Sequence, residues 1–291
     1  MSVVGLGCNN FGFRVDLDGT RLVVDAALDA GVTLLDTADT YGDGDSESFL
    51  GEVLQGRRDR VVIATKFGGR MEGRGGGSRA QIHKAIEASL ARLRTDYVDL
   101  YQYHVPDGVT PIEETLGALN ELVEAGKVRS IGSSNFSSAQ VDEAERVAQD
   151  RGTAHFVSAQ NEYSLLRREA EKELLPTCER LGLGVLPYFP LASGLLTGKY
   201  RRGDPIPEGT RLSGRPDVFT DEKFDRLEAL EAFAQERGLS LLHVAIGGLL
   251  AQPAVTSVIA GATKPEQVRA NVEAGTWKPS ADDVAALNAL R

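Results

Sequence analysis

The stretch VTLLDTADTYG, residues 32–42, begins as an apolar run and then changes to carboxylates, hydroxyls and a tyrosine. The run VVIATK, residues 61–66, ends in a lysine, and YVDLYQYH, residues 97–104, ends in a histidine. Nearly continuous apolar runs of this kind are typical of strands that are buried on both faces of a parallel sheet. The three stretches therefore predict a parallel sheet with polar groups at the carboxyl ends of its strands.

Eight segments fit this strand pattern, and they are spaced along the whole chain. They are residues 3–7, 32–38, 61–67, 97–104, 128–135, 156–163, 184–190 and 256–262. Amphipathic stretches with helical spacing of apolar residues lie between them, at 20–30, 79–93, 111–125 and 138–149. Eight alternating strands and helices predict an α/β fold, a (β/α)8 or TIM barrel, formed as a single domain by residues 1–291.

Two connections in this pattern are unusually long. Residues 193–217 follow the seventh strand and are rich in glycine, proline and arginine, and residues 68–78 follow the third strand and are rich in glycine. Long connections inside a compact domain are usually functional, so we expect both on the active face and the second to be mobile. Extra helices are predicted at 221–237 and 239–250, before the last strand, and a final helix at 281–291.

The composition limits the classes of partner. The 291 residues carry a formal net charge of -10, which argues against nucleic acid or an anionic membrane as the main partner. Cys8 and Cys178 imply no disulfide framework, and the four histidines lack metal-ligand spacing, so no zinc site is expected. No leader or membrane-spanning run stands out, and we expect a cytoplasmic protein.

Four polar residues lie at or just past successive strand ends: Asp36, Tyr41, Lys66 and His104. Each has an ordinary explanation when taken alone, because aspartate forms turns, lysine is usually solvated and a strand histidine is usually hydrogen-bonded structure. In a parallel barrel, however, all strand ends open on one face, where such barrels place their chemistry. A phenol, an amine, a carboxylate and an imidazole on that face predict a proton-donating site.

These four residues resemble the catalytic tetrad of the aldo-keto reductases. The matching segments follow the family's order along nearly the whole chain, at 36–42, 66, 101–104, 132–136, 160–163 and 261–263. The resemblance implies a bacterial NADP-dependent oxidoreductase that interconverts an alcohol and an aldehyde or ketone by hydride transfer from NADPH, with NADH the less favoured coenzyme. Tyr41 would be the general acid.

Elementary chemistry supports those roles. A free tyrosine has a pKa of about 10 and is a sluggish acid at neutral pH. A nearby ammonium, here Lys66, lowers that pKa, and Asp36 would keep Lys66 charged and oriented. His104 would donate a hydrogen bond to the substrate oxygen. We therefore expect the pKa of Tyr41 to be lowered.

The coenzyme site follows from the resemblance, because the one GxG, residues 5–7, lacks the rest of a Rossmann fingerprint. Ser134, Asn135 and Gln160 match residues that hold the nicotinamide carboxamide, and Tyr188 matches the ring that stacks on the nicotinamide. The clasp over the pyrophosphate matches Leu191, Ser193, Gly194, Lys199 and Arg211. The residues that bind the adenosine 2′-phosphate and the adenine in the family are matched here by Gly261, Thr263, Lys264, Gln267 and Asn271. Three other loop arginines are interpreted as solvated: Arg201, Arg202 and Arg215.

The substrate is expected to be a small carbonyl compound that is apolar or aromatic. Its pocket is predicted to be lined by Phe11, Phe67 and Tyr103. The sequence near His104 has no extra cluster of lysine or arginine that would indicate an acidic substrate. We expect broad specificity and a monomer.

The chain departs from the family pattern at three places. Ala260 stands where proline is common, and Ala270 stands where a glutamate often binds the adenosine, which predicts a weaker hold on the coenzyme. An N-terminal hairpin that usually covers the bottom of the barrel is not seen before the first strand, which predicts exposed core residues there.

Two other functions fit parts of the pattern. One is a redox-sensing NADPH-binding protein that resembles the potassium-channel β subunits, which keep the tetrad. The other is an isomerase or lyase that uses Lys66 as a Schiff-base nucleophile. The second leaves four residues unexplained: Tyr41, Ser134, Asn135 and Gln160.

Overall fold

The computed structural model describes residues 1–69 and 76–290. Eight parallel strands form one sheet in the order β7-β6-β5-β4-β3-β2-β1-β8. The strands are β1 (Val4–Gly7), β2 (Leu34–Asp36), β3 (Val62–Phe67), β4 (Val98–Tyr103), β5 (Val128–Ser134), β6 (Phe156–Gln160), β7 (Gly184–Val185) and β8 (Val258–Gly261). Each predicted strand is present, and all are shorter than predicted.

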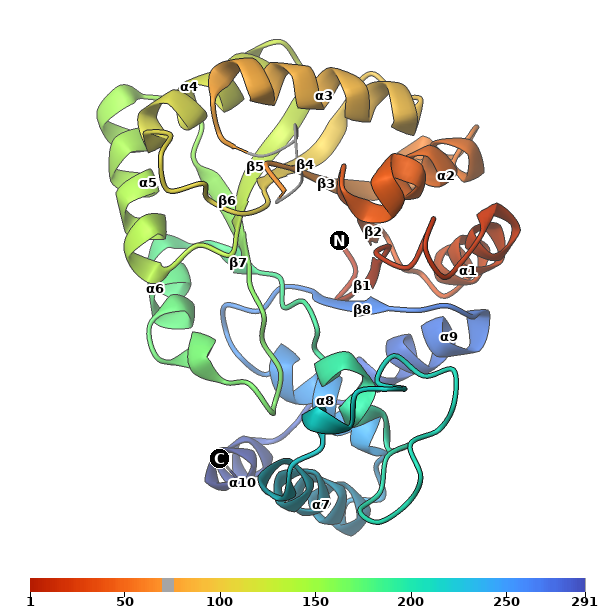
Figure 1. Ribbon diagram of the computed structural model, residues 1–291. Coiled ribbons are helices and arrows are strands. Elements are labelled where there is room, and N and C mark those ends of the chain that lie inside the picture. Colours follow the sequence, from red (N-terminus) through yellow and green to blue (C-terminus); the bar gives the residue numbers. More distant parts are fainter. Residues whose placement is uncertain (70–75, 291) are drawn as a thin grey trace.

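The sheet curls until its two edge strands meet. The amide of Thr256 donates to the carbonyl of Val185 at 3.0 Å, and the amide of Ile259 donates to the carbonyl of Pro187 at 3.0 Å. These bonds join the β7 side of the sheet to the β8 side, and the two strands lie near each other in Figure 1. The predicted (β/α)8 barrel is confirmed.

Helices cover the outer face of the sheet (Figure 1). They are α1 (Leu17–Asp29), α2 (Asp45–Val53), α3 (Arg79–Leu93), α4 (Ile112–Glu124), α5 (Ser138–Arg151), α6 (Leu174–Leu181), α7 (Asp221–Glu236), α8 (Leu241–Leu250), α9 (Pro265–Ala274) and α10 (Ala281–Ala289). The sequence pattern did not delimit α2 and α6, because both are short and α6 buries only Leu174, Leu175 and Cys178. The predicted bounds of α3 agree with the structure.

The core has two parts because strand side chains alternate between the two faces of the sheet. Most buried apolar residues lie between the sheet and the helices. A small second cluster fills the inside of the barrel and consists of Leu34, Ala64, Leu100, Leu186 and Ile259. Polar residues that follow this inward-facing set along the strands are thereby directed to the open end of the barrel.

One of the two long connections differs from the prediction, and the other lies mainly outside the described residues. The first begins with a 3₁₀ helix at Ala192–Thr197 and ends near another at Pro216–Val218, so it is less irregular than expected. The predicted mobile loop, residues 68–78, falls mainly on residues 70–75, which lie outside the described residues. Among residues 1–69 and 76–290, no helix has the length and apolar character needed to cross a bilayer.

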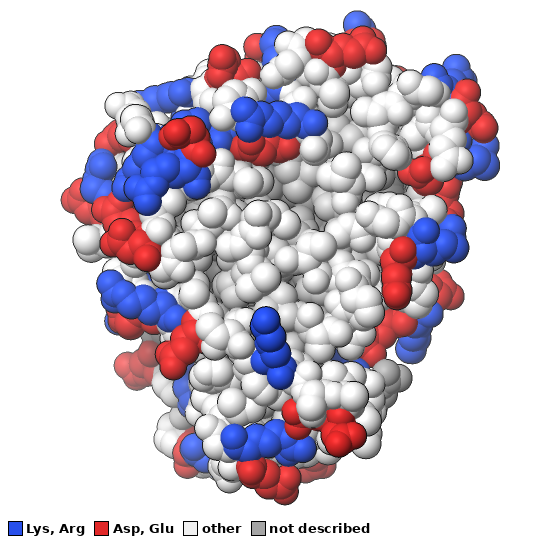
Figure 2. Space-filling model, turned by 180° about the vertical axis from the view of Figure 1, so that it is seen from behind, with Lys and Arg blue, Asp and Glu red and all other residues white. Residues whose placement is uncertain are grey.

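The surface is mixed in charge. Figure 2 shows one face with an uncharged centre, around which acidic and basic residues alternate. No continuous basic stripe of the kind that binds nucleic acid is visible on this face. Met1 and Val3, which precede β1, are 60% and 52% exposed, whereas Val4 at the start of β1 is 4% exposed.

Candidate active site

The carboxylate of Asp36 and the ammonium of Lys66 form a buried ion pair at the ends of β2 and β3. The Lys66 Nζ lies 2.8 Å from each carboxylate oxygen and 2.8 Å from the carbonyl oxygen of Thr37. The Lys66 side chain is 0% exposed and that of Asp36 is 4% exposed. A buried lysine can remain charged with partners of this quality.

Tyr41 reaches this pair from a 3₁₀ turn, η1 (Tyr41–Gly44). Its hydroxyl lies 3.5 Å from the Lys66 Nζ. The turn needs glycine at Gly42, where φ is 57° and a Cβ would lie 2.8 Å from the carbonyl oxygen of Phe11. The loop after β1 therefore packs directly on the turn and fixes the position of the phenol.

Two glutamines complete the hydrogen bonding of Asp36. The Gln160 Nε2 donates to its Oδ1 at 2.8 Å, and the Gln102 Nε2 lies 3.4 Å from the same atom. The sequence analysis missed Gln102, although it is spaced by two from Leu100 and His104 and so faces the inside of the barrel with them. Gln160, which the resemblance assigned to the coenzyme, is engaged with Asp36 in this structure.

The pKa of Tyr41 moves in the direction opposite to the expected one. Burial raises the pKa of the phenol, Lys66 lowers it and Asp36 raises it, and the net direction is upward. Burial also opposes the charge of Lys66, but Asp36 and Tyr41 outweigh it and hold the pKa of Lys66 above its usual value. The expected lowering of the Tyr41 pKa is wrong because dehydration of the phenolate exceeds its attraction to the ammonium. Tyr41 thus keeps its proton at neutral pH.

His104 is a neutral imidazole. Burial, reinforced by the charge of Lys66, lowers the pKa of His104 to about 3. Its ring meets the Tyr41 ring edge to face, with centroids 5.9 Å apart. A neutral imidazole has one N–H, so His104 can donate one hydrogen bond to an oxygen placed beside Tyr41.

A cavity of about 750 Å³ opens over these residues. Asp36, Tyr41 and His104 are part of its wall, whereas Lys66 lies behind them and does not line it. The volume is within the range of small-molecule and cofactor sites. The phenol and the imidazole therefore face the ligand space, and the amine acts on that space only through the phenol.

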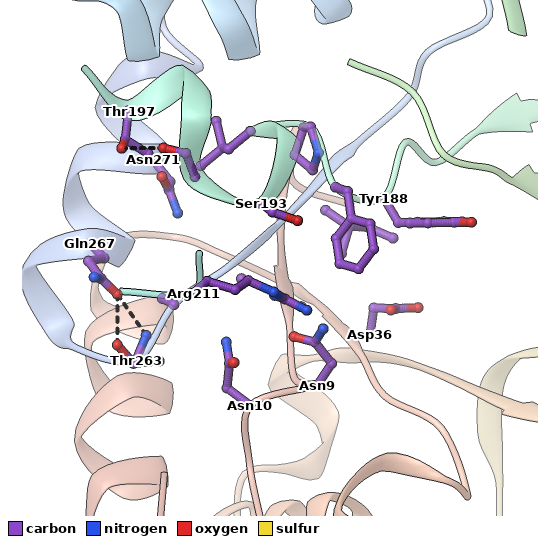
Figure 3. A pocket seen from close by; sticks show the side chains of 18 of the residues that line it. Asn9, Asn10, Asp36, Tyr188, Ser193, Thr197, Arg211, Thr263, Gln267 and Asn271 are labelled. Atoms are coloured by element: carbon purple, nitrogen blue, oxygen red, sulfur yellow. Dashed lines mark hydrogen bonds between the residues drawn. The ribbon is translucent and has the colours of Figure 1, made fainter. Parts of the chain in front are cut away.

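All of the residues that the resemblance assigned to the coenzyme line this same cavity. They are Ser134, Asn135, Gln160, Tyr188, Leu191, Ser193, Gly194, Lys199, Arg211, Gly261, Thr263, Lys264, Gln267 and Asn271. They come from the ends of β5, β6 and β8, from the connection after β7 and from α9, which lie far apart in the sequence. Figure 3 shows several of them around one space, with Gln267 bonded to Thr263.

Hydrogen bonds fix one wall of the cavity. Asn135 has a left-handed backbone, with φ 59°. Its Nδ2 donates to the carbonyl oxygen of His104 at 2.9 Å, and its Oδ1 accepts from the hydroxyl of Tyr188 at 2.7 Å. The amide thus ties the end of β4, which carries His104, to the aromatic ring of Tyr188, which follows β7.

The charge of the cavity is opposite to that of the whole chain. Its described wall contains four cations, Arg14, Lys199, Arg211 and Lys264, and a single acidic residue, Asp36, which is neutralised by Lys66. None of these four cations forms an ion pair within residues 1–69 and 76–290. Ala270 also lines the cavity, and it brings no carboxylate to the position where the family often has one. The cavity is suited to an anionic ligand.

Arg201, Arg202 and Arg215 differ from these four cations. Arg202 pairs with Asp221, Asp225 and Glu228, Arg215 pairs with Asp217, and Arg201 pairs with Glu231. None of the three lines the cavity. Their interpretation as surface residues of the loop agrees with these contacts.

Phe11, Phe67 and Tyr103 do not line the cavity, and the prediction for them is wrong. Phe11 and Phe67 are 0% exposed and Tyr103 is 3% exposed. Phe67 stacks on Tyr103, with ring centroids 5.0 Å apart. The reason is strand alternation: Lys66 faces the inside of the barrel, so Phe67 faces the helices, as Tyr103 does beside Gln102.

The sequence analysis also missed residues after β1. Asn9, Asn10 and Arg14 line the cavity, as does Phe189 next to Tyr188. Their position directly after a strand end was a signal that could have found them.

Comparisons with known proteins agree with this geometry. Residues 3–291 match the model of the aldo/keto reductase family. The chain is 38% identical to the aldo-keto reductase YhdN of Bacillus subtilis (strain 168), over 91% of this chain and 81% of that protein. It is 37% identical to a probable voltage-gated potassium channel subunit beta of Oryza sativa subsp. japonica, over 91% and 84%. It is 35% identical to the L-glyceraldehyde 3-phosphate reductase of Escherichia coli (strain K12), over 91% and 81%.

The matched length and these identities, together with eight strands that curl into a barrel, assign the fold and the class of chemistry. This chain belongs to the aldo/keto reductase family of oxidoreductases, whose members generally use NAD(P)H.

Proposed function

We propose that residues 1–291 act as one domain that reduces an aldehyde or ketone to an alcohol with NADPH, and that Tyr41 is the proton donor. The observation that carries this proposal is the chain of contacts from Asp36 through Lys66 to Tyr41. Of these three residues, only Tyr41 presents a proton to the cavity. The balanced reaction consumes the carbonyl compound, NADPH and one proton, and gives the alcohol and NADP⁺. The bound coenzyme supplies the hydride.

The residues of the cavity fit such a coenzyme. The amide N–H groups of Asn135 and Gln160 already donate within the protein, but their oxygens can accept a further hydrogen bond, and Tyr188 offers a ring face held by its hydroxyl. Lys199 and Arg211 are cations without a carboxylate partner among the described residues, as the phosphates of a dinucleotide require. These features support a dinucleotide as the main ligand of the cavity.

The catalytic roles follow from the protonation states. Tyr41 gives its proton to the carbonyl oxygen as that oxygen gains charge. The ammonium of Lys66, 3.5 Å away, stabilises the phenolate that remains, and Asp36 holds the ammonium in place. His104, as a neutral donor, holds the oxygen beside Tyr41. Because Lys66 is charged, saturated with partners and absent from the cavity wall, it is poorly suited to form a Schiff base.

A preference for NADPH over NADH rests on one end of the cavity. Lys264 and Thr263 lie where β8 leads into α9, and Lys264 has no acidic partner in the described chain. A free cation at a helix start favours a phosphate group. Ala270 lowers the expected hold on the adenosine, so the preference depends on Lys264.

Tyr41→Phe tests the proposal. We expect NADPH to bind to the variant with near wild-type affinity in a fluorescence titration, because the ring is kept. The turnover of carbonyl compounds should fall by about 10²–10⁴, the usual contribution of a positioned general acid. Near-normal turnover of a carbonyl substrate by this variant would eliminate the assignment.

A second function is a redox sensor that resembles the potassium-channel β subunits, because one such protein is 37% identical to this chain. It would bind NADPH at the same site and reduce carbonyls slowly. Single-turnover and steady-state rates separate the two functions. A sensor would show fast binding, very slow release of the coenzyme and turnover limited by that release.

A further inference from the structure

The carboxylate of Glu47, in the first turn of α2, is completely buried although the proposed chemistry does not use it. Its side chain is 0% exposed and does not belong to the described wall of the cavity. Arg92 of α3 pairs with it. The Nε of Arg92 donates to the Oε2 of Glu47 at 2.8 Å, and a second guanidinium nitrogen lies 2.6 Å from the same oxygen. Burying a carboxylate is costly even when it is paired, so we ask what this pair supports.

The pair lies against the turn that carries Tyr41. Gly44, the last residue of η1, has a φ of 98°, and a Cβ there would lie 3.0 Å from the Cδ of Arg92 and 3.2 Å from its Nε. A Cβ on Gly51, further along α2, would lie 2.2 Å from the carbonyl oxygen of Arg92. Arg92 therefore contacts α2 with both its side chain and its backbone, where α2 and α3 lie side by side (Figure 1). Because only glycine leaves room for the arginine stem, the end of the Tyr41 turn and Arg92 fix each other's positions.

The first turn of α2 is also bonded to the groups that position Lys66. The hydroxyl of Thr65, the neighbour of Lys66 on β3, donates to the Oε1 of Glu47 at 2.5 Å. The hydroxyls of Ser46 and Thr37 lie 2.8 Å apart, and the carbonyl oxygen of Thr37 accepts from the Lys66 Nζ at 2.8 Å. Glu47 and Ser46 thus reach Lys66 by two routes, one through β3 and one through the residue after β2.

One helical turn therefore connects the two partners of the catalytic contact. The Tyr41 hydroxyl lies 3.5 Å from the Lys66 Nζ. The attraction between a phenolate and an ammonium falls with distance, and a misplacement of about 1 Å can cost about 10² in rate. We propose that Glu47 and Arg92 are positioning residues, which hold the phenol of Tyr41 at its distance from Lys66. This inference rests on the proposed role of Tyr41 as the proton donor.

The kinetic test compares Arg92→Gln with Arg94→Gln. Both variants remove an arginine that pairs with α2, but Arg94 reaches Glu52, at the other end of α2 from the Tyr41 turn, at 3.7 Å. The assay is the single-turnover oxidation of bound NADPH by benzaldehyde. We expect Arg92→Gln to lower this rate by about 10–10². The dissociation constant of NADPH in a fluorescence titration should stay unchanged, because the pair lies outside the cavity wall. The control Arg94→Gln should change neither quantity.

A double-mutant cycle with Tyr41→Phe shows whether Arg92 acts through the phenol. If it does, Arg92→Gln should lower the rate of Tyr41→Phe much less than it lowers the rate of the wild type, because the group that it positions is already absent. A general role in the stability of the fold would instead lower both rates by the same factor.

Thr65→Val is a milder variant that tests the same contacts if Arg92→Gln does not fold. It removes the hydroxyl that donates to Glu47 and leaves the ion pair in place. The single-turnover rate should fall severalfold, again with an unchanged affinity for NADPH and with the same dependence on Tyr41.

Three results would overturn the inference. They are an equal loss of rate in the wild-type and Tyr41→Phe backgrounds, a parallel loss of rate and of NADPH affinity, or a wild-type rate in both Arg92→Gln and Thr65→Val. In each case a large loss of rate in Tyr41→Phe alone would leave the proposed function standing. A near-normal rate in Tyr41→Phe would instead reject the proposed function, and this inference with it.

Discussion

The buried group of Asp36, Lys66 and Gln160 differs sharply from the four cations of the cavity wall. In the buried group, the Asp36 Oδ1 accepts from both Lys66 and Gln160 at 2.8 Å. On the wall, the cations have no acidic partner within the described chain. The first set is complete without a ligand, whereas the second set can take up an anion.

The difference shows that the charges next to Tyr41 and the charges available to a ligand are held in different ways. Charges buried inside the barrel must be paired, because an unpaired buried ion costs several kcal/mol. That pairing fixes the geometry around Tyr41 before any ligand arrives, as electrostatic catalysis requires. Cations in a water-filled cavity remain hydrated, so they can stay unpaired until an anion binds. Three predictions test this contrast, beginning with the largest effect.

Lys66→Met should have the largest effect, because it leaves the carboxylate of Asp36 buried without its cation. We expect the free energy of unfolding to fall by about 3–5 kcal/mol, the usual cost of breaking a buried pair. The kcat should fall by at least about 10²–10³, because the phenolate of Tyr41 loses its stabilising charge. Urea unfolding and steady-state assays measure the two quantities.

The double variant Asp36→Asn/Lys66→Met is the control for this first prediction. It removes both charges, so much of the lost stability should return while the activity stays low. If the single and double variants unfolded at the same urea concentration, the pair would not be the tightly coupled unit described above.

The second prediction concerns His104 and acid. The pKa of His104 is about 3 in the folded protein, against 6.5 for the free side chain. Between these values the unfolded chain binds a proton that the folded protein does not, so stability falls as the pH falls below 6.5. At 1.36 kcal/mol per pH unit, the loss from pH 6.5 to 5 is about 2 kcal/mol.

His104→Gln should remove this part of the pH dependence. The free energy of unfolding of the variant between pH 7.5 and 5 should change by about 2 kcal/mol less than that of the wild type. All other side chains are common to both proteins, so their contributions cancel in the difference. Parallel pH curves for the two proteins would mean that His104 is charged, and hence better solvated, in the folded state.

The smallest effect is expected for Lys264→Ala at the cavity wall. Because Lys264 is exposed, water and salt screen its charge, and its contribution should be about 1 kcal/mol. The ratio of kcat/KM for NADPH to that for NADH should therefore fall by roughly fivefold, with stability unchanged. An unchanged ratio would remove Lys264 from the 2′-phosphate site and leave the coenzyme preference without a residue to carry it.

The sequence was sufficient for the features that depend on neighbouring residues. Apolar runs that end in Asp36, Lys66 and His104 predicted strands whose polar ends meet, and the barrel confirmed this arrangement. The motifs at 132–136 and 261–263 predicted residues that do line one cavity. Such patterns are local, because a strand end and the turn after it occupy a few consecutive positions.

The predictions from the sequence were wrong where they depended on the direction of a side chain or on its burial. Phe67 and Lys66 are adjacent, yet the alternation of β3 directs one to the helices and the other to the barrel interior. The pKa of Tyr41 was expected to fall and instead rises, because burial outweighs the nearby ammonium.

The sequence alone thus determined the class of fold and the chemical groups that face the open end of the barrel, since strand periodicity and order along the chain set both. Only the tertiary structure decided which charges are paired, which aromatic rings are buried and that the loop after β1 packs on the turn that carries Tyr41. Those outcomes depend on contacts between loops distant in sequence and on the loss of water around each group, and no single segment of the sequence determines either of them.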